Sequence, residues 1–178
     1  NYKLGFYLKK NLVLTGMMGV GKSTVGKAVA DKLSMNFVDI DKIIEIKENL
    51  TVSDIFKKRG EAHFRNLEEK ITIEEIKKTN IVVSLGGGAF INSNIRSKIL
   101  KECVSFWLDL RPELIEKRVK NSKRRPLLEK TNLKETLIKI YNERKETYNL
   151  ANFKIDCNKI ELNLIVSKIT NLYANFKN

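Results

Sequence analysis

The chain has 178 residues, of which 42% are hydrophobic and only two are proline. This composition excludes a disordered or proline-rich chain, and the length suits one domain of ordinary size with its own core. The formal net charge is +13, which favours an anionic partner: nucleic acid, an acidic membrane surface or a phosphorylated small molecule. A biased composition accounts for the excess equally well, so charge alone does not choose among these.

The numbers of cysteines and histidines and the length of the apolar runs exclude further classes of protein. Cys103 and Cys157 have neither the number nor the spacing of a disulfide framework or a zinc site, so we expect a reducing, cytoplasmic compartment. One histidine, His63, excludes a mechanism that needs several imidazole ligands. No run reaches the roughly 18 apolar residues of a membrane span, so we expect no membrane partner.

Short apolar or β-branched runs alternate along the chain with longer stretches of helical period, which is typical of parallel strands connected by helices. After the strand predicted at 37–39, a capping box of Thr51 and Asp54 predicts the start of a short helix, and Gly60 is expected to end it. Helical spacing then predicts two apolar faces, one with Phe64, Leu67 and Ile71, and a last one with Ile160, Leu164, Ile169, Leu172 and Phe176. The predicted strands are 12–15, 37–39, 81–85, 104–108 and 153–156.

The strongest motif follows the first predicted strand directly. Residues 16–24 read GMMGVGKST, which satisfies the G-x-x-x-x-G-K-[ST] phosphate-loop pattern. Its glycines let successive backbone N–H groups approach phosphate oxygens, and the helix that follows adds its positive end. Lys22 supplies a charge for the β- and γ-phosphates, and the Ser23 hydroxyl is a candidate Mg²⁺ ligand. The residues predicted to bind ATP here are Gly19, Val20, Gly21, Lys22, Ser23 and Thr24.

A phosphate loop identifies a nucleotide rather than a reaction, because switch GTPases, motor ATPases and small-molecule kinases all contain one. None of the six aspartates is followed three positions later by glycine, so the sequence contains no D-x-x-G switch motif.

Polar residues and glycines follow the next two predicted strands. Asp39 and Asp41 come at the end of the second, and Gly86, Gly87 and Gly88 follow the third. The carboxyl ends of parallel strands meet at one edge of the sheet, where ligands bind in open α/β folds, and consecutive glycines indicate a close backbone approach. Each feature alone also suits an ordinary strand end or turn.

Together and in this order, the motifs resemble the shikimate kinase family, and the resemblance runs over nearly the whole chain. It implies a three-layer α/β P-loop fold with a five-stranded parallel sheet, in one domain over 1–178. It also implies an acceptor-binding helical segment at about 40–79 and a mobile lid at about 120–133. The matching segments are the phosphate loop, 37–41, Gly60-Glu61 with Phe64-Arg65 and Glu68, 85–88, 125–128, and Arg144 with Tyr148 and Ala151.

The family resemblance implies that a monomer transfers the γ-phosphoryl group of ATP to the 3-hydroxyl of shikimate. It also implies the roles of single residues. Asp41, Arg65, Gly86, Gly87, Gly88 and Arg144 would hold shikimate, and Ser23 and Asp39 would serve Mg²⁺, Asp39 through water. Lys22, Asp41 and Arg125 would be catalytic, with Arg125 reaching the ATP phosphates from the lid and Arg118 lying against adenine. Shikimate carries a carboxylate and three hydroxyls, which suits two arginines and a carboxylate acceptor.

Much of the basic excess lies around the predicted lid: Lys117–Lys145 contains eleven Lys and Arg against three acidic residues, a local charge of +8.

Two alternative functions remain beside that of a shikimate kinase. One is another small-molecule kinase of this fold, for gluconate or a nucleoside monophosphate. The other is a basic nucleic-acid-binding P-loop protein, which needs interleaved aromatic side chains. Tyr141 is the only aromatic residue in that basic segment, so we expect no nucleic-acid partner.

Overall fold

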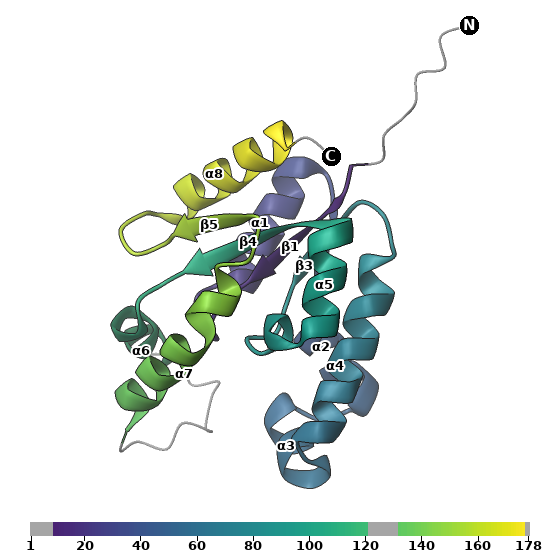
Figure 1. Ribbon diagram of the computed structural model, residues 1–178, viewed down its shortest axis with the longest axis vertical. Coiled ribbons are helices and arrows are strands. Elements are labelled where there is room, and N and C mark those ends of the chain that lie inside the picture. The colour runs from purple at the N-terminus through teal and green to yellow at the C-terminus, as the bar shows by residue number, and fades with distance from the viewer. Residues whose placement is uncertain (1–8, 121–131, 177–178) are drawn as a thin grey trace, which may run out of the picture.

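The computed structural model describes residues 9–120 and 132–176. Most of the predicted lid, residues 121–131 with Arg125, lies outside the described residues. Figure 1 shows a central sheet with helices on both sides.

Five parallel strands form the sheet, in the order β2-β3-β1-β4-β5. The predicted strands are confirmed, each with ends within one residue of the expected ones. β1 lies in the middle and pairs with β3 on one side and β4 on the other. The strand order therefore reverses beside β1, and open α/β sheets bind ligands at such a topological switch point. The strands are β1 (Asn11–Thr15), β2 (Asn36–Asp39), β3 (Ile81–Ser84), β4 (Cys103–Asp109) and β5 (Phe153–Asp156).

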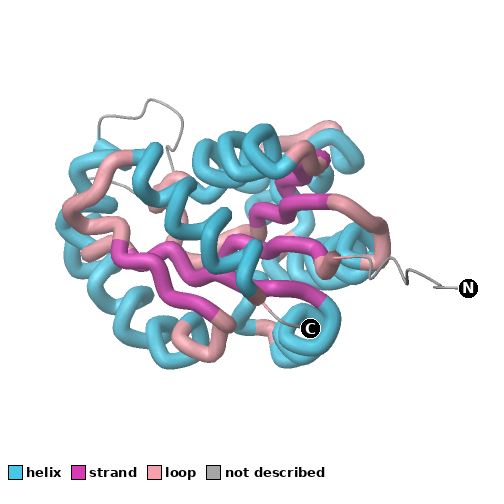
Figure 2. Tube along the Cα trace, turned by 90° about the horizontal axis from the view of Figure 1, so that it is seen from above, coloured by secondary structure: helices cyan, strands magenta, loops and turns pink. Residues whose placement is uncertain are grey.

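Helices cover both faces of this sheet and give three layers (Figure 2). Helices α1 (Lys22–Leu33) and α8 (Leu162–Asn175) pack together on one face, and α4 (Glu61–Ile76) and α5 (Ser93–Glu102) pack together on the other. The predicted acceptor segment contains α4 and two short helices packed against it. The remaining elements are α2 (Ile40–Glu48), α3 (Val52–Arg59), the 3-10 turn η1 (Ala89–Ile91), α6 (Pro112–Lys120) and α7 (Leu133–Tyr148).

Local signals in the sequence fix where the short helices begin and end. The Thr51 hydroxyl accepts a hydrogen bond from the Asp54 N–H at 3.1 Å, which confirms the predicted start of α3. Gly60 ends α3 with φ at +85°, a conformation that glycine adopts at little cost. Asp39 likewise begins α2, since its carboxylate accepts from the Lys42 N–H at 3.2 Å.

The predicted apolar face of the last helix was partly wrong. Ile169 is buried, but Leu164 is 55% exposed and Ile160 precedes the helix. The face that packs on α1 and β5 is turned by about one residue, because Ile165 and Val166, rather than Leu164, have helical spacing with Ile169. Its buried members are Ile165, Val166, Ile169, Thr170 and Tyr173.

No helix within 9–120 or 132–176 has both the length and the hydropathy that a membrane crossing requires.

Candidate active site

The phosphate loop joins β1 to α1 at the carboxyl end of the sheet. Its glycines Gly16, Gly19 and Gly21 have φ of +138°, +78° and +98°, values that a side chain strongly disfavours. Space is also short at Gly16, where a Cβ would lie 2.7 Å from the Leu108 carbonyl oxygen. The motif therefore needs glycine for both its backbone conformation and its packing against β4.

Lys22 is the first residue of α1 and folds back over the loop. Its side chain is buried, and Nζ donates hydrogen bonds to the carbonyl oxygens of Gly16 and Met17, each at 2.8 Å. The ammonium group thus lies beside the N-terminal end of α1, where the helix dipole also places positive charge. Together they make this turn a strong anion site.

Ser23 and Asp39 meet across the gap between α1 and β2. The Ser23 hydroxyl donates to the Asp39 carboxylate, with 2.5 Å between Oγ and Oδ2. Mg²⁺ in nucleotide sites commonly takes one or two protein oxygens and completes its shell with water and phosphate oxygens. A hydroxyl and a carboxylate in contact beside the phosphate loop fit that requirement, and no larger group of acidic, His or Cys ligands occurs among the residues described.

Two carboxylates converge on the backbone of Gly86, just beyond β3. A Cβ at Gly86 would lie 2.6 Å from Asp41 Oδ1 and 2.7 Å from Glu68 Oε2. Asp41 comes from the first turn of α2, and Glu68 from the buried face of α4. Glycine at this position leaves space for both acids on one side of the turn.

Arg65 lies beside Gly88, held by acidic residues of its own helix. Its Nη1 is 2.7 Å from Glu68 Oε1, and its Nε is 3.3 Å from Glu61 Oε1. A Cβ at Gly88 would lie 2.5 Å from Arg65 Nη1, so the guanidinium packs directly on the glycine backbone. Burial raises the pKa of the Glu68 carboxyl; the charge of Arg65 opposes this shift and that of Asp41 adds to it.

Arg144 reaches the same glycine turn from α7, on the opposite side. Its Nη1 donates to the Gly87 carbonyl oxygen at 3.0 Å, and the hydroxyl of Tyr148, one helical turn later, donates to the same oxygen. Tyr148 is fully buried, and its ring lies 5.9 Å from that of Trp107. The two arginines therefore flank the Gly87–Gly88 backbone.

The glycine turn also adjoins the phosphate loop. A Cβ at Gly87 would lie 3.2 Å from the Met18 backbone nitrogen and 3.7 Å from the Gly16 carbonyl oxygen. The two clusters are thus one site, with an anion-binding loop on one side and two arginines with two carboxylates on the other.

The structure brings together most of the predicted site residues. Lys22, Ser23 and Asp39 meet at the loop, and Asp41, Arg65 and Arg144 meet at Gly86, Gly87 and Gly88. Val20 is buried within the loop, and Thr24 is exposed on the first turn of α1. Arg118, expected against adenine, donates from Nη1 to the Val20 carbonyl at 2.8 Å. Arg125 lies outside the described residues.

Sequence reasoning missed two contributors. Glu68 and Tyr148 were noted only as part of the family pattern, without a role. For Glu68 a signal was available, since an acidic residue at the same helical spacing as Phe64 and Ile71 must be buried and needs a partner. Tyr148 offered none, because its partner is the carbonyl of a residue 61 positions away.

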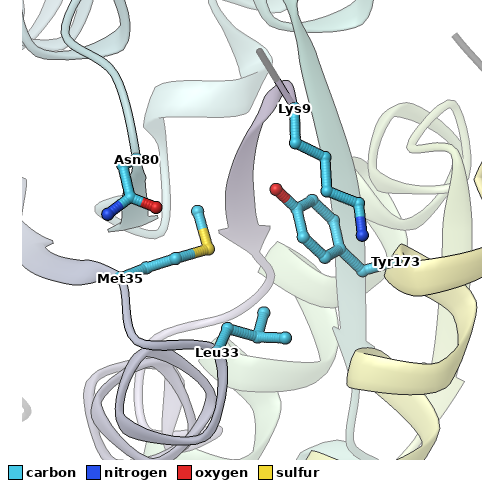
Figure 3. Close-up of a pocket in the computed structure, with 5 residues that line it drawn as sticks. All are labelled: Lys9, Leu33, Met35, Asn80 and Tyr173. Atoms are coloured by element: carbon cyan, nitrogen blue, oxygen red, sulfur yellow. The ribbon is translucent and has the colours of Figure 1, made fainter. Parts of the chain in front are cut away.

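The opposite end of the sheet looks quite different (Figure 3). A cavity of about 170 Å³ there is lined by Leu33, Met35, Asn80 and Tyr173, with the Lys9 ammonium 4.4 Å from the Tyr173 ring centre. It contains no predicted site residue and no acidic side chain, so it offers no acceptor or metal chemistry.

Known proteins match this chain over nearly all of its length. The family model for shikimate kinase matches residues 18–174. A shikimate kinase of Sulfurihydrogenibium sp. is 43% identical over 160 residues, covering 90% of this chain and 95% of the relative. The solved structure of shikimate kinase from Acinetobacter baumannii in complex with shikimate has a TM-score of 0.87 at 32% identity, and the match covers 94% of this chain and 96% of that one. Shikimate kinase from Bacteroides thetaiotaomicron gives 0.86 at 30% identity, with coverage of 93% and 98%. The chain therefore belongs to the shikimate kinase family.

Proposed function

We propose that this chain transfers the γ-phosphoryl group of ATP to the 3-hydroxyl of shikimate, which yields shikimate 3-phosphate and ADP. One observation carries the proposal: the turn Gly86–Gly88 contacts the phosphate loop at Gly87 and is flanked by two arginines and two carboxylates. An acceptor with a carboxylate at one end and hydroxyls at the other fits this arrangement, with its reacting oxygen next to the phosphates.

Arg65 and Arg144 would bind the shikimate carboxylate. A guanidinium group offers several N–H donors in a planar fork that matches a carboxylate, and two such groups flank Gly87 and Gly88. The ion pair with Glu68 fixes the Arg65 side chain before substrate arrives, which lowers the entropy lost on binding. Asp41 would accept hydrogen bonds from shikimate hydroxyls on the other side of the turn.

Lys22 would stabilise the β- and γ-phosphates together with the N-terminus of α1. Its Nζ already lies over the loop, so little reorganisation is needed when negative charge spreads over the transferred group. Ser23 and Asp39 would hold Mg²⁺, Asp39 through water; the ion, when bound, neutralises phosphate charge. Arg118 would contribute near the nucleotide through its contact with the loop, and Arg125 keeps its predicted role at the ATP phosphates.

Asp41 would also act on the proton of the reaction. As the 3-hydroxyl oxygen bonds to the γ-phosphorus, the bond from that phosphorus to the β-bridging oxygen breaks, and the hydroxyl proton passes to the Asp41 carboxylate. Because the transition state is largely dissociative, orienting the hydroxyl contributes more than removing the proton early.

One chain carries every proposed site residue, so we propose that a monomer is sufficient for activity. The two cysteines are buried free thiols, which suits a reducing, cytoplasmic compartment. We propose no nucleic-acid partner, and assign the basic excess of the lid region to ATP phosphates.

A coupled ADP-release assay tests the function, with ATP, Mg²⁺ and either shikimate, gluconate or AMP as acceptor. We expect release well above the ATP-only background with shikimate alone. Release with gluconate or AMP but not shikimate would instead support another small-molecule kinase of this fold. A salt-dependent gel shift with single- and double-stranded DNA should show no complex at physiological ionic strength.

A further inference from the structure

The carboxylate of Asp109, at the end of β4, joins three elements of the fold. The Tyr141 hydroxyl of α7 donates to Oδ1 at 2.9 Å, and the Lys154 ammonium group of β5 lies 3.1 Å from Oδ2. Asp109 is only 7% exposed, and a buried carboxylate is costly unless its oxygens have partners. No step of the proposed reaction uses Asp109 or Tyr141, so their contact needs a separate explanation.

Tyr141 lies on the same face of α7 as the two residues that contact the glycine turn. Arg144 and Tyr148 follow it by three and seven positions, which is the spacing of a single helix face. Both of them donate to the Gly87 carbonyl oxygen, whereas Asn142, the residue after Tyr141, is exposed. This face therefore attaches α7 to the end of β4 at one point and to the glycine turn at the next.

The position of α7 depends on these attachments. Its backbone packs chiefly against α6, beside which it lies in Figure 1, and against η1. The contacts of α7 with β4 are made by two long side chains, Tyr141 and Tyr148. Tyr141 precedes Arg144 by about 4.5 Å along the helix axis, so a slide or rotation of α7 after loss of the Asp109 contact would also move the Arg144 guanidinium.

Binding of a carboxylate by Arg144 is sensitive to such a movement. A guanidinium group binds a carboxylate through a planar fork of donors, whose positions must match both oxygens. The hydrogen bond to Gly87 holds Nη1, and the orientation of the rest of the fork depends on the helix that carries it. A misplacement of about 1 Å in such a site is enough to impair it.

We propose that Tyr141 is a positioning residue for acceptor binding: its hydrogen bond to Asp109 fixes the rotation and axial position of α7 and so places the Arg144 guanidinium to bind the acceptor's carboxylate. The inference rests on the proposed function, because it assumes that Arg144 binds the carboxylate of shikimate.

Asp109 is itself held in place, so it is a fixed partner for Tyr141. Its backbone carbonyl accepts from the Cys157 N–H at 2.8 Å. The Lys154 ammonium that pairs with its carboxylate also lies 4.5 Å from the centre of the Trp107 ring. Burial raises the pKa of Tyr141 to about 12, and the Asp109 hydrogen bond adds to the shift, so the hydroxyl stays protonated and donates at neutral pH.

The test compares Tyr141→Phe with a matched control, Tyr173→Phe, in the ADP-release assay. The Tyr173 hydroxyl donates to the Lys10 backbone carbonyl at 2.7 Å, at the other end of the sheet. In Tyr141→Phe, Arg144 keeps its charge but loses its fixed position, so we expect the KM for shikimate to rise about fivefold to tenfold, with the KM for ATP unchanged. Tyr173→Phe should leave both KM values unchanged.

A double-mutant cycle with Arg144→Ala separates the positioning of Arg144 from a general loosening of the fold. Arg144→Ala alone should raise the KM for shikimate. If Tyr141 acts through Arg144, adding Tyr141→Phe should raise this KM by less than a further twofold. The proposal is overturned if Tyr141→Phe by itself leaves the KM within twofold of the unaltered value, or if it raises the KM by the same factor with and without Arg144.

Asp109→Glu covers the case in which Tyr141→Phe does not fold. It keeps the charge beside Lys154 but moves the oxygen that Tyr141 contacts by one methylene, so we expect the same rise in KM and the same loss of effect beside Arg144→Ala. The same contrary results would overturn the proposal.

The cycle also distinguishes failure of the inference from failure of the proposed function. If shikimate supports ADP release but the effects of the two substitutions multiply, the inference fails while the proposed function stands. Absence of ADP release with shikimate in the unaltered protein would overturn the function and, with it, the inference.

Discussion

The two halves of the active site are built in different ways. In the phosphate loop, Lys22 bonds to carbonyl oxygens five and six positions away, and three glycines with positive φ lie within six residues. In the acceptor half, the Gly86–Gly88 turn gathers Asp41 and Arg65 from α2 and α4 and Arg144 from α7. One half is therefore a contiguous sequence motif, whereas the other consists of side chains from three helices that meet at a glycine turn.

This difference predicts how each half responds to substitution. A change in the phosphate loop should affect every reaction of ATP in the site, including slow hydrolysis. A change in the acceptor half should affect shikimate and leave ATP binding intact, because its residues come from other segments.

The largest effect is expected for Lys22→Met. Losing a cation at the transferred phosphoryl group should lower kcat by about 10³- to 10⁵-fold with shikimate, and should lower the background hydrolysis of ATP as well. The control is Lys27→Met, an exposed lysine of the same helix. Steady-state ADP release, with and without shikimate, measures both variants. A kcat of Lys22→Met within tenfold of the unaltered value would contradict a catalytic role for Lys22.

Asp41→Asn comes next and belongs to the acceptor half. The amide keeps the shape but loses the proton acceptor, so kcat with shikimate should fall roughly 10²- to 10⁴-fold. ATP hydrolysis without acceptor should not change, in contrast to Lys22→Met. Asp31→Asn, at an exposed position of α1, serves as the control. Near-normal turnover in Asp41→Asn would show that Asp41 does not accept the proton.

Gly86→Ala tests the convergence of the two carboxylates. Its Cβ would lie 2.6 Å from Asp41 Oδ1 and 2.7 Å from Glu68 Oε2, and both side-chain ends can shift, so the fold should survive. Displacing them should raise the KM for shikimate roughly tenfold to a hundredfold, with the KM for ATP unchanged. The contrasting variant is Gly60→Ala, where nothing lies within 4 Å of the added Cβ but φ is +85°. It should cost about 1 to 3 kcal/mol of stability, because φ of +85° with ψ of 165° is a backbone conformation essentially restricted to glycine, and it should alter neither KM.

A smaller effect is expected for Thr51→Ala, which removes the side-chain cap of α3. We expect the free energy of unfolding to drop by about 1 kcal/mol, measured by urea denaturation. Ser53→Ala, two residues later in the same helix, should change it by less than about 0.5 kcal/mol. The kcat of Thr51→Ala should not change, since the cap does not contact the proposed site.

The smallest effect concerns alkaline pH and Tyr141, which donates to Asp109 at 2.9 Å. Burial raises the pKa of Tyr141 to about 12, with the Asp109 hydrogen bond adding to the shift. An unfolded tyrosine ionises near ~10, so between these values the unfolded state binds fewer protons and stability falls as pH rises. Tyr141→Phe should therefore lose stability less steeply from about pH 10 to 12 in urea titrations, and equal slopes would refute the assignment.

Elements with local causes were predictable from sequence. The strands follow from short apolar runs, the start of α3 from Thr51 and Asp54, and the phosphate loop from its spacing. The face of α8 was not, because Ile160 and Leu164 also have helical spacing, and no capping side chain marks the start of the helix at Leu162. Tyr148 was not given a role because it acts on the Gly87 carbonyl, which only folding brings near, whereas the helical spacing of Glu68 with Phe64 and Ile71 could have shown its burial.

The sequence by itself determined the α/β class, the anion-binding loop and the family pattern, because each depends on residues close together in the chain or on their order. Only the tertiary structure decided that Gly87 touches the phosphate loop, that Asp41 and Glu68 share the space at Gly86, and that one carbonyl accepts both Arg144 and Tyr148. These contacts join the ends of different strands and helices. Their geometry depends on how the layers pack, and no local pattern encodes that packing.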